Sequence, residues 1–196
     1  TMIFRQPIMN TSVPDMACNN VPIQLSDLST VNGGTISGWE WYVDNEIYYA
    51  KDTSHLFAQP GKQNVLLKII SNKGCENEEL KEVQVYEKPF ADFITRCNCT
   101  NEETEFVDKS INPASWKWDF GNSNSSIERK PPAQAYMESG MYDVSLITSN
   151  LNGCFDTVSK TIEIHPAPKA QFLVSSICEG KEASFINVSS RLIPKT

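Results

Sequence analysis

Six cysteines are the residues of this 196-residue sequence with the clearest chemistry. A thiol can bind a metal, pair as a disulfide or stay free, and the spacing here is not that of a zinc site. Such cysteines form disulfides in an oxidising compartment, whereas in the cytosol they would be buried free thiols. We favour disulfides and therefore expect an extracellular or cell-surface protein.

Catalysis would need several ionisable side chains that converge on one place. The two histidines, His55 and His165, are 110 residues apart in the sequence. A catalytic triad or a metal site requires more partners than these two residues offer. We therefore expect both histidines to be structural or solvent-exposed, and we expect the protein not to be an enzyme.

Two acidic stretches could bind calcium, the run Glu76–Glu79 and the pair Glu102–Glu103. Calcium needs several oxygen ligands from one rigid loop, and the sequence contains no D-x-D-x-D-G pattern. Solvated strand edges, whose charges also discourage aggregation, are the interpretation we favour. We expect no cofactor, with calcium as the alternative.

Two tryptophan pairs recur in the sequence, Trp39 with Trp41 and Trp116 with Trp118, and Phe120 continues the second pair. Residues two positions apart lie on the same face of a strand. Such rings could stack on sugars or could fill a hydrophobic core. Their alternation with polar residues favours the core.

The composition excludes two kinds of partner. The net charge is −7, so the chain has no basic face for nucleic acid and is disfavoured at an anionic membrane. No run of about 18 apolar residues is present, so we expect no membrane insertion. The first ten residues lack the features of a signal peptide, and we expect a mature product or a piece of a longer chain.

The elements that carry these residues alternate with period 2, as half-buried strands do. One stretch, Glu78–Glu82, could be argued as a helical turn, but its counterpart in a repeat described below has the pattern of a strand. We therefore expect an all-β protein without long helices. The clearest strands are 65–69, 83–86, 90–94, 141–147 and 158–164.

Internal repetition is the strongest signal. Three cysteines each precede an apolar residue by seven positions, and a similar polar tail follows each: Cys18 before Leu25, Cys99 before Phe106, and Cys178 before Phe185. The step from residue 18 to residue 99 is 81 residues, and from 99 to 178 it is 79. A second cysteine recurs in Ser71–Cys75 and Asn150–Cys154.

Short proline-bearing joints divide the repeats and leave little slack between them. Two units are complete, and each end of the sequence carries part of another, so we expect a segment of a longer array. The predicted boundaries are 1–7 for the last strand of a preceding repeat, 8–87 and 88–167 for two domains, and 168–196 for the first strands of an incomplete one.

The stretch Trp116–Asn122 resembles the W-x-F-G-D-G signature of the PKD domain, and Gly140–Leu146, with Tyr142, resembles its G-x-Y-x-V-x-L strand. Pro132–Tyr136 stands where the family has P-x-H-x-Y. The resemblance implies tandem immunoglobulin-like β-sandwiches of about seven strands each. The first unit is divergent, since Asn64 replaces the tyrosine that corresponds to Tyr142.

In the second unit this resemblance predicts seven strands and a hairpin at 150–153. They are A at 89–96, B at 103–109, C at 115–120, a short C′ or D near 124–128, E at 133–137, F at 141–149 and G at 155–164.

The strand order of such a sandwich bears on the disulfides. Cys18 or Cys99 in the A–B turn would lie at one end of a domain, and Cys75 or Cys154 after the F–G hairpin at the other. A seven-residue strand spans roughly 23 Å, whereas disulfide Cα atoms are about 5.5–6 Å apart. We therefore favour Cys18–Cys154 between domains over Cys18–Cys75 and Cys99–Cys154 within them.

The remaining cysteines would follow the same scheme. Cys99 would pair with the hairpin of the third unit, Cys75 with an earlier unit, and Cys178 belongs to the third A–B turn. Cys97 fits neither scheme and is expected to be a buried free thiol. A bent or rearranged A strand would instead permit pairing within each domain.

The family resemblance also implies a function. Arrays with these paired cysteines resemble gliding-motility adhesins and related bacterial surface filaments exported by type IX secretion, so we expect a non-enzymatic stalk or adhesin segment. Its partners would be neighbouring repeats, surface glycans or other surface proteins. The alternative is a carbohydrate- or protein-binding module of a secreted hydrolase, which an exposed aromatic strip would favour.

Overall fold

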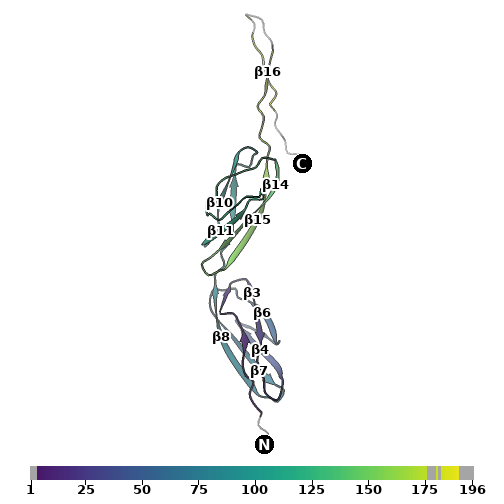
Figure 1. Cartoon of the computed structure of the whole chain (residues 1–196), viewed down its shortest axis with the longest axis vertical. Helices are drawn as coiled ribbons and strands as arrows, with labels where there is room; N and C mark the ends of the chain where they lie inside the picture. The colour runs from purple at the N-terminus through teal and green to yellow at the C-terminus, as the bar shows by residue number, and fades with distance from the viewer. Residues whose placement is uncertain (1–3, 176–179, 181, 190–196) are drawn as a thin grey trace. The chain divides into compact units, whose positions relative to one another are not determined.

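The computed structural model describes residues 4–175, 180 and 182–189, and this part of the chain is all-β. It divides into two compact units, one formed by Thr1–Lys88 with Asn150–Cys154 and the other by Pro89–Ser149 with Phe155–Thr196. Figure 1 shows the strands of the first unit in purple to blue and those of the second from teal through green to yellow-green. No helix suited to crossing a membrane is found among the described residues.

The first unit is a sandwich of two sheets. One sheet has the order β1-β3-β6, with bounds Thr11–Ser12, Pro22–Asp27 and Asp52–Leu56. The other has the order β2-β8-β7-β4-β5, with bounds Met16–Cys18, Glu76–Tyr86, Gly61–Ser71, Ile36–Val43 and Glu46–Tyr48.

The first strand of this unit is shared between the two sheets. Its first part, β1, pairs antiparallel with β3, and its second part, β2, pairs parallel with β8. Pro14 lies between the two parts and cannot donate a backbone hydrogen bond, so the ladder is interrupted there. The crossing places Cys18 opposite Tyr86, at the end of β2.

The inner faces of the two sheets form the first core. Trp41 and Val43 on β4, and Leu67 and Ile69 on β7, are buried at alternate positions, as the period-2 pattern predicts. The region considered as a helical turn is part of strand β8. The other members of this core are Ala17, Leu25, Phe57, Val65, Val83 and Val85.

The second unit has the same architecture. One sheet has the order β13-β10-β9, with bounds Gln134–Ala135, Glu103–Asp108 and Phe93–Arg96. The other has the order β12-β11-β14-β15, with bounds Ser125–Ser126, Ser115–Asp119, Gly140–Ser149 and Phe155–Ile164. Strands B, C, F and G agree with the sequence-based bounds to within one residue.

Strands A and E are shorter than the sequence predicts. Strand A has an isolated bridge, between Phe90 and Ile111, before β9 begins. Strand E is reduced to the two residues of β13, of which Gln134 pairs with Thr104. Counting back along this antiparallel register brings Pro132 opposite Phe106, and proline has no N–H to donate to a longer ladder.

An aromatic cluster fills the second core. The Trp118 ring lies 5.4 Å from Phe93 and 6.1 Å from Phe106, between ring centroids. Phe120 stacks on Trp118 at 6.0 Å, and Tyr136 donates a hydrogen bond to the Phe120 carbonyl at 2.7 Å. Trp118, Phe120 and Tyr136 of the signature are therefore core residues, and Trp116 and Tyr142 pack against this core while partly buried.

Beyond the second core, β16 (Phe172–Val174) and β17 (Phe185–Asn187) form an antiparallel pair. Phe172 and Phe185 correspond in the repeat to Phe93 and Phe106, but their exposed fractions are 63% and 68%. Their ring centroids are 5.8 Å apart, close to the 6.2 Å between Phe93 and Phe106. The pair thus reproduces the first two strands of the repeat.

Candidate functional site

The structure contains a disulfide between Cys18 and Cys154, whose Cα atoms are 5.6 Å apart. Cys18 ends β2, and Cys154 lies directly before β15. The loop Asn150–Cys154 connects β14 to β15 of the second unit but groups with the first unit. The disulfide therefore joins the A–B turn of one repeat to the F–G hairpin of the next.

The thiols of Cys75, Cys97 and Cys99 are free. The pairings within one repeat, Cys18–Cys75 and Cys99–Cys154, are accordingly not formed in the structure. Cys178, the remaining disulfide candidate, lies outside the described residues.

Cys75 occupies the same turn as Cys154. The backbone N–H of Cys75 donates to Ser71 Oγ at 3.1 Å, and that of Cys154 donates to Asn150 Oδ1 at 3.0 Å. In both hairpins the preceding glycine has a positive φ, 77° at Gly74 and 84° at Gly153. A short polar side chain at the start of the turn therefore holds both cysteines in the same way.

Cys99 likewise occupies the position of Cys18. Cys18 pairs in parallel with Tyr86, and Cys99 forms a parallel bridge with His165. The next residue donates to the same carbonyl in each case, Asn19 N to Tyr86 O at 2.9 Å and Thr100 N to His165 O at 2.8 Å. Cys75 and Cys99 thus repeat the backbone geometry of the bonded pair.

Cys97 has a different environment from the other cysteines. It is exposed, with a left-handed φ of 61°, and its carbonyl accepts a hydrogen bond from Thr104 Oγ1 at 2.9 Å. The sequence predicts a buried free thiol at this position. The thiol is free, but Cys97 is exposed, so the prediction of burial is wrong. The reason is that the chain leaves β9 at Arg96 and turns outward before the bridge at Cys99.

Both tryptophan pairs are fixed by hydrogen bonds. Trp41 and Trp118 are fully buried, and their indole N–H groups donate to the carbonyls of Ala50 and Glu128 at 3.1 and 2.9 Å. A fixed, buried ring has no free face for a sugar.

The other member of each pair is half-buried and donates to an aspartate. Trp39 Nε1 lies 2.7 Å from Asp27 Oδ2, and Trp116 Nε1 lies 3.0 Å from Asp108 Oδ2. Arg129 adds a cationic contact at the second site, 5.8 Å from the Trp116 ring centroid. These two rings lie at the border of the core and are tied to strand B.

Sequence reasoning missed the role of the polar tail after strand B. In each repeat a carboxylate or amide oxygen accepts from the N–H of the serine two residues later, at 2.9 Å; the pairs are Asp27 with Ser29, Asp108 with Ser110, and Asn187 with Ser189. The serine Oγ in turn accepts from a strand-A N–H, of Asn10, Asp92 or Gln171. The recurrence of the tail in the sequence could have revealed this turn. The strand pairing shows that the turn connects the end of strand B to strand A.

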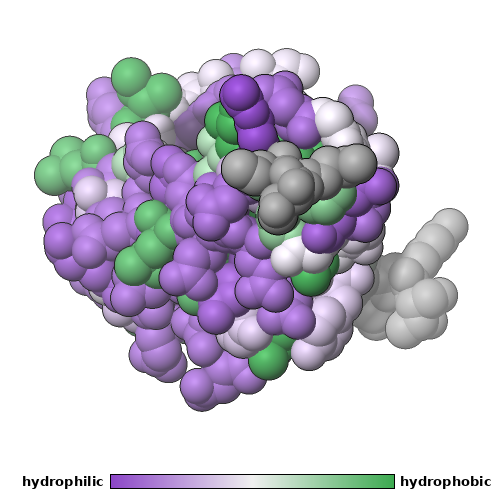
Figure 2. Space-filling model, turned by 90° about the horizontal axis from the view of Figure 1, so that it is seen from below, coloured by the Kyte–Doolittle hydropathy of each residue, from purple (hydrophilic) through white to green (hydrophobic). Residues whose placement is uncertain are grey.

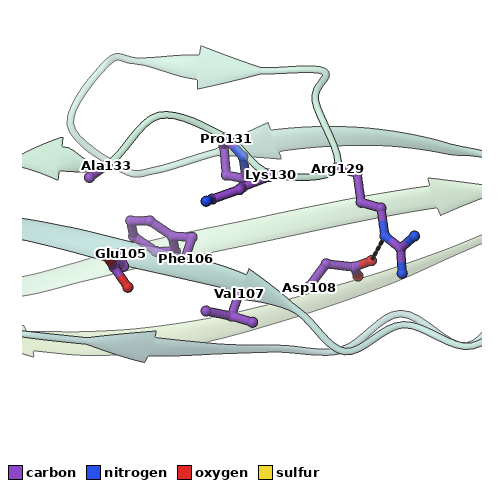
Figure 3. A pocket seen from close by; sticks show the side chains of 8 residues that line it. All are labelled: Glu105, Phe106, Val107, Asp108, Arg129, Lys130, Pro131 and Ala133. Carbon is purple, nitrogen blue, oxygen red and sulfur yellow. Dashed lines mark ion pairs between the residues drawn. The ribbon is translucent and has the colours of Figure 1, made fainter.

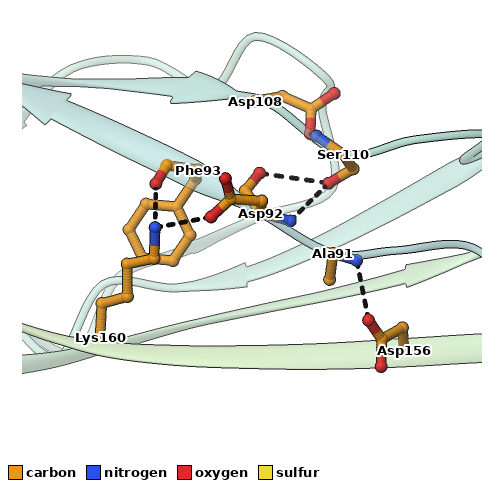
Figure 4. Close-up of polar contacts among 7 residues, drawn as sticks. All are labelled: Ala91, Asp92, Phe93, Asp108, Ser110, Asp156 and Lys160. Carbon is orange, nitrogen blue, oxygen red and sulfur yellow. Dashed lines mark hydrogen bonds and ion pairs between the residues drawn. The ribbon is translucent and has the colours of Figure 1, made fainter.

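In the second unit, Asp92, which donates to the serine of this turn, also forms an ion pair (Figure 4). Lys160 Nζ lies 2.6 Å from Asp92 Oδ1 and donates to the Phe93 carbonyl at 2.5 Å. The hydrogen bond from Lys160 lowers the pKa of the Asp92 carboxyl, against the smaller effect of burial. Lys160 therefore ties strand G to strand A.

Tyr136 and Tyr142, the two signature tyrosines, contact each other with ring centroids 4.5 Å apart. Burial raises the pKa of Tyr136 to about 12. Tyr142 is half-buried and donates to the Glu138 carbonyl at 3.0 Å. Both phenol hydroxyls therefore donate to backbone carbonyls, which is a structural role.

His55 is buried in the first unit and bonded through both ring nitrogens. Nδ1 lies 2.8 Å from the Tyr48 hydroxyl and Nε2 lies 3.0 Å from Asp44 Oδ2. The Tyr48 hydroxyl also donates to Glu46, and burial raises the pKa of Tyr48 to about 12. With no nucleophile in this group, we interpret it as a structural clamp between β5 and β6.

His165 belongs to the second unit and is half-exposed, 3.6 Å from Glu163. It is therefore not part of the His55 group. Among the described residues, no group of three or more His, Cys, Asp or Glu side chains is arranged to hold a metal.

The second unit has a cleft of about 330 Å³ beside β10 (Figure 3). The cleft lies along β10, next to the point where the pairing of β10 with β13 stops. Phe106 and Pro131 are among its lining residues. Arg129 Nε lies 3.6 Å from Asp108 at one side of the cleft.

The face of the molecule in Figure 2 is mostly hydrophilic, with separate hydrophobic patches rather than a broad apolar surface.

One family model and several solved structures are similar to parts of this chain. Residues 87–166 match the family model of the PKD domain. The PKD1 domain of the Vibrio cholerae metalloprotease PrtV is 29% identical and covers 40% of this chain and 98% of its own, with a TM-score of 0.36. The PKD1 domain of Vibrio anguillarum Epp is 16% identical and covers 43% of this chain and 99% of its own, with a TM-score of 0.39.

The fibronectin(III)-like modules of Clostridium thermocellum CbhA are 15% identical and cover 81% of this chain and 95% of their own, with a TM-score of 0.40. No match was found among curated proteins. The family match and the two sandwiches together show an all-β chain of immunoglobulin-like units that contains a PKD-like domain at residues 87–166.

Proposed function

We propose that this chain is a non-enzymatic structural segment of a secreted, repeat-containing surface protein. Its task would be to extend and present other parts of the protein, as in a bacterial adhesin or gliding-motility filament exported by type IX secretion. Each unit buries its own core, so stability is local and length can grow with the number of repeats.

The observation that carries this proposal is the recurrence of the cysteine geometry. Cys18 and Cys154 are bonded, while Cys99 and Cys75 have the same backbone environments with free thiols. A repeated pair of this kind lets one disulfide be formed at each joint of an array. Such disulfides would restrict bending at the joints and would resist separation of the repeats under load.

Disulfide mapping of a polypeptide with at least three repeats tests this function. Proteolysis without reductant, followed by mass spectrometry, is expected to yield a peptide that links Cys18 to Cys154 and one that links Cys99 to the next hairpin cysteine. A peptide that links Cys18 to Cys75 would contradict the proposal, because each repeat would then be stabilised independently.

A mechanical measurement tests the consequence of the disulfide. In a single-molecule pulling experiment, we expect reductant to increase the total extension of the unfolded chain, because the intact disulfide keeps the segment between Cys18 and Cys154, which are 136 residues apart, from being stretched. Cys18→Ser should give the same increase without reductant, and Cys97→Ser should behave as the unmutated chain. Equal extensions in all three proteins would contradict a load-bearing disulfide.

The second candidate function is a binding module of a secreted hydrolase. Half-exposed tryptophans on both units, Trp39 and Trp116, favour it. Their indole groups are held by aspartates, however, so we rank it below the structural function. A turnover screen against polysaccharides and peptides is expected to show no activity, and turnover by the purified chain would contradict both candidates.

A further inference from the structure

The outer face of the five-stranded sheet in the first unit carries a groove of about 690 Å³. It lies over β4, β7 and β8, on the side opposite the core. Gly38 forms part of its floor, and a Cβ there would lie 2.6 Å from Cγ2 of Ile70. The strand register also shifts between Ile36 and Gly38. The missing side chain leaves Ile70 as an open apolar floor.

Register places a row of charged residues along one side of this floor. Glu40, Lys68 and Glu78 are direct cross-strand neighbours. Lys68 Nζ lies 3.4 Å from Glu78 and 5.4 Å from the Tyr42 ring centroid, and Glu40 accepts the Tyr42 hydroxyl at 2.6 Å. The one ammonium in the groove is thus already compensated.

The next cross-strand row contains a carboxylate that no lysine or arginine of the groove neutralises. Glu76 follows Gly38 and Ile70 across the sheet, and it forms no ion pair with any described residue. Tyr49 also lines the groove, and 74% of its surface is exposed. The groove therefore has an apolar floor, an exposed aromatic wall and more carboxylates than ammonium groups.

These three features suit one chemical group. A lysine or arginine side chain has an apolar stem that packs on aliphatic surface and a charged head that needs a carboxylate. Its head is also attracted to the face of a phenol ring. An anionic ligand would meet Glu40, Glu76 and Glu78, and a neutral sugar would leave the uncompensated charge of Glu76 unused.

We propose that the groove over β4, β7 and β8 binds an arginine or lysine side chain presented by an extended segment of a protein partner. The proposal goes beyond the structural function and does not depend on the disulfides. The stem lies over Gly38 and Ile70, the head reaches Glu76, and Tyr49 closes the side. The groove volume accommodates such a side chain with its flanking backbone.

Fluorescence anisotropy with the whole chain tests this site. The probe is a short fluorescein-labelled glycine–serine peptide with a central arginine pair, and its control carries citrulline, a neutral isostere of arginine. We expect the citrulline peptide to bind at least about tenfold more weakly. Binding of the arginine peptide should also weaken as salt is raised.

Variants separate the groove from the general acidity of the chain. Tyr49→Ala changes no charge and should weaken binding about fivefold, and Glu76→Gln should weaken it about tenfold. Ile127→Ala and Glu138→Gln make matched changes at exposed positions of the other unit and should leave affinity unchanged.

Three results would overturn the proposal. One is an equal affinity for the arginine peptide in all four variants, since the net charge of the chain alone would then explain the binding. Another is no binding of the arginine peptide at millimolar concentration. The third is binding of a neutral β-linked glucose oligosaccharide that Tyr49→Ala abolishes, because the groove would then be a glycan site. Circular dichroism of each variant establishes that it is folded before affinity is compared.

Discussion

Gly121, which follows the signature strand β11, offers the sharpest test of the second unit. Its φ is +71°, a conformation that costs a residue with a side chain about 1–2 kcal/mol. A Cβ at this position would also lie 2.5 Å from the carbonyl oxygen of Asp143. Gly121→Ala therefore meets two separate penalties.

The second penalty cannot be relieved cheaply, because the crowded atoms belong to the backbone. Asp143 lies in β14 and pairs with Thr161 of β15. Making room would shift a strand that is bonded on both sides, and overpacking of this kind costs about 1–3 kcal/mol. We expect Gly121→Ala to destabilise the second unit by about 2–5 kcal/mol in total.

Gly153→Ala is the matched control. Its φ of +84° carries the same backbone penalty, but no atom lies within 4 Å of the added Cβ. Urea unfolding followed by tryptophan fluorescence gives both free energies of unfolding. Gly121→Ala should lose about 1–3 kcal/mol more than Gly153→Ala. Equal losses would refute the argument that close approach to Asp143 requires this glycine.

Three further predictions concern the polar contacts. Asp108→Ala removes the acceptor of both Trp116 Nε1 and Ser110 N, and urea unfolding should show a loss of about 2–3 kcal/mol, against less than about 1 kcal/mol for Asp119→Ala, which loses one exposed turn bond; similar losses would mean that the indole bond is weak. His55→Ala empties a buried site between Tyr48 and Phe57, and calorimetry should show a loss of about 2–4 kcal/mol in the first unit only; an unchanged first transition would contradict the clamp. Because the folded pKa of Asp92 is lowered, its contribution to stability is present above the ordinary value of 3.8 and is lost as pH falls through the folded pKa; Lys160→Met should flatten this part of the stability profile, and an unchanged slope would show that Lys160 is not the cause.

The strands, and the face of each strand that turns inward, could be predicted from residue spacing alone. Trp116, Trp118 and Phe120 alternate with polar residues, and this spacing alone puts them on one face of a strand. The repeat of cysteine and serine positions likewise predicted two equivalent units. Local alternation needs no knowledge of distant contacts, which is why the all-β fold and the bounds of strands such as β11 could be predicted.

Other features depend on residues that are far apart in the sequence. Strand E was predicted too long because the effect of Pro132 appears only when it lies opposite β10. The serine turn had a recurring sequence but no visible partner, since Ser110 bonds to Asp92 across two strands. The exposure of Cys97 depends on where β9 ends.

The cysteine pairing and the groove depend most clearly on contacts between distant parts of the chain. From sequence, Cys18 could pair with Cys75 or with Cys154, and the choice depends on which strand ends meet. The groove exists because three strands bring Gly38, Ile70 and Glu76 into one row. Spacing along a chain sets which face a side chain occupies, but its neighbours across a sheet are set by strand order and register.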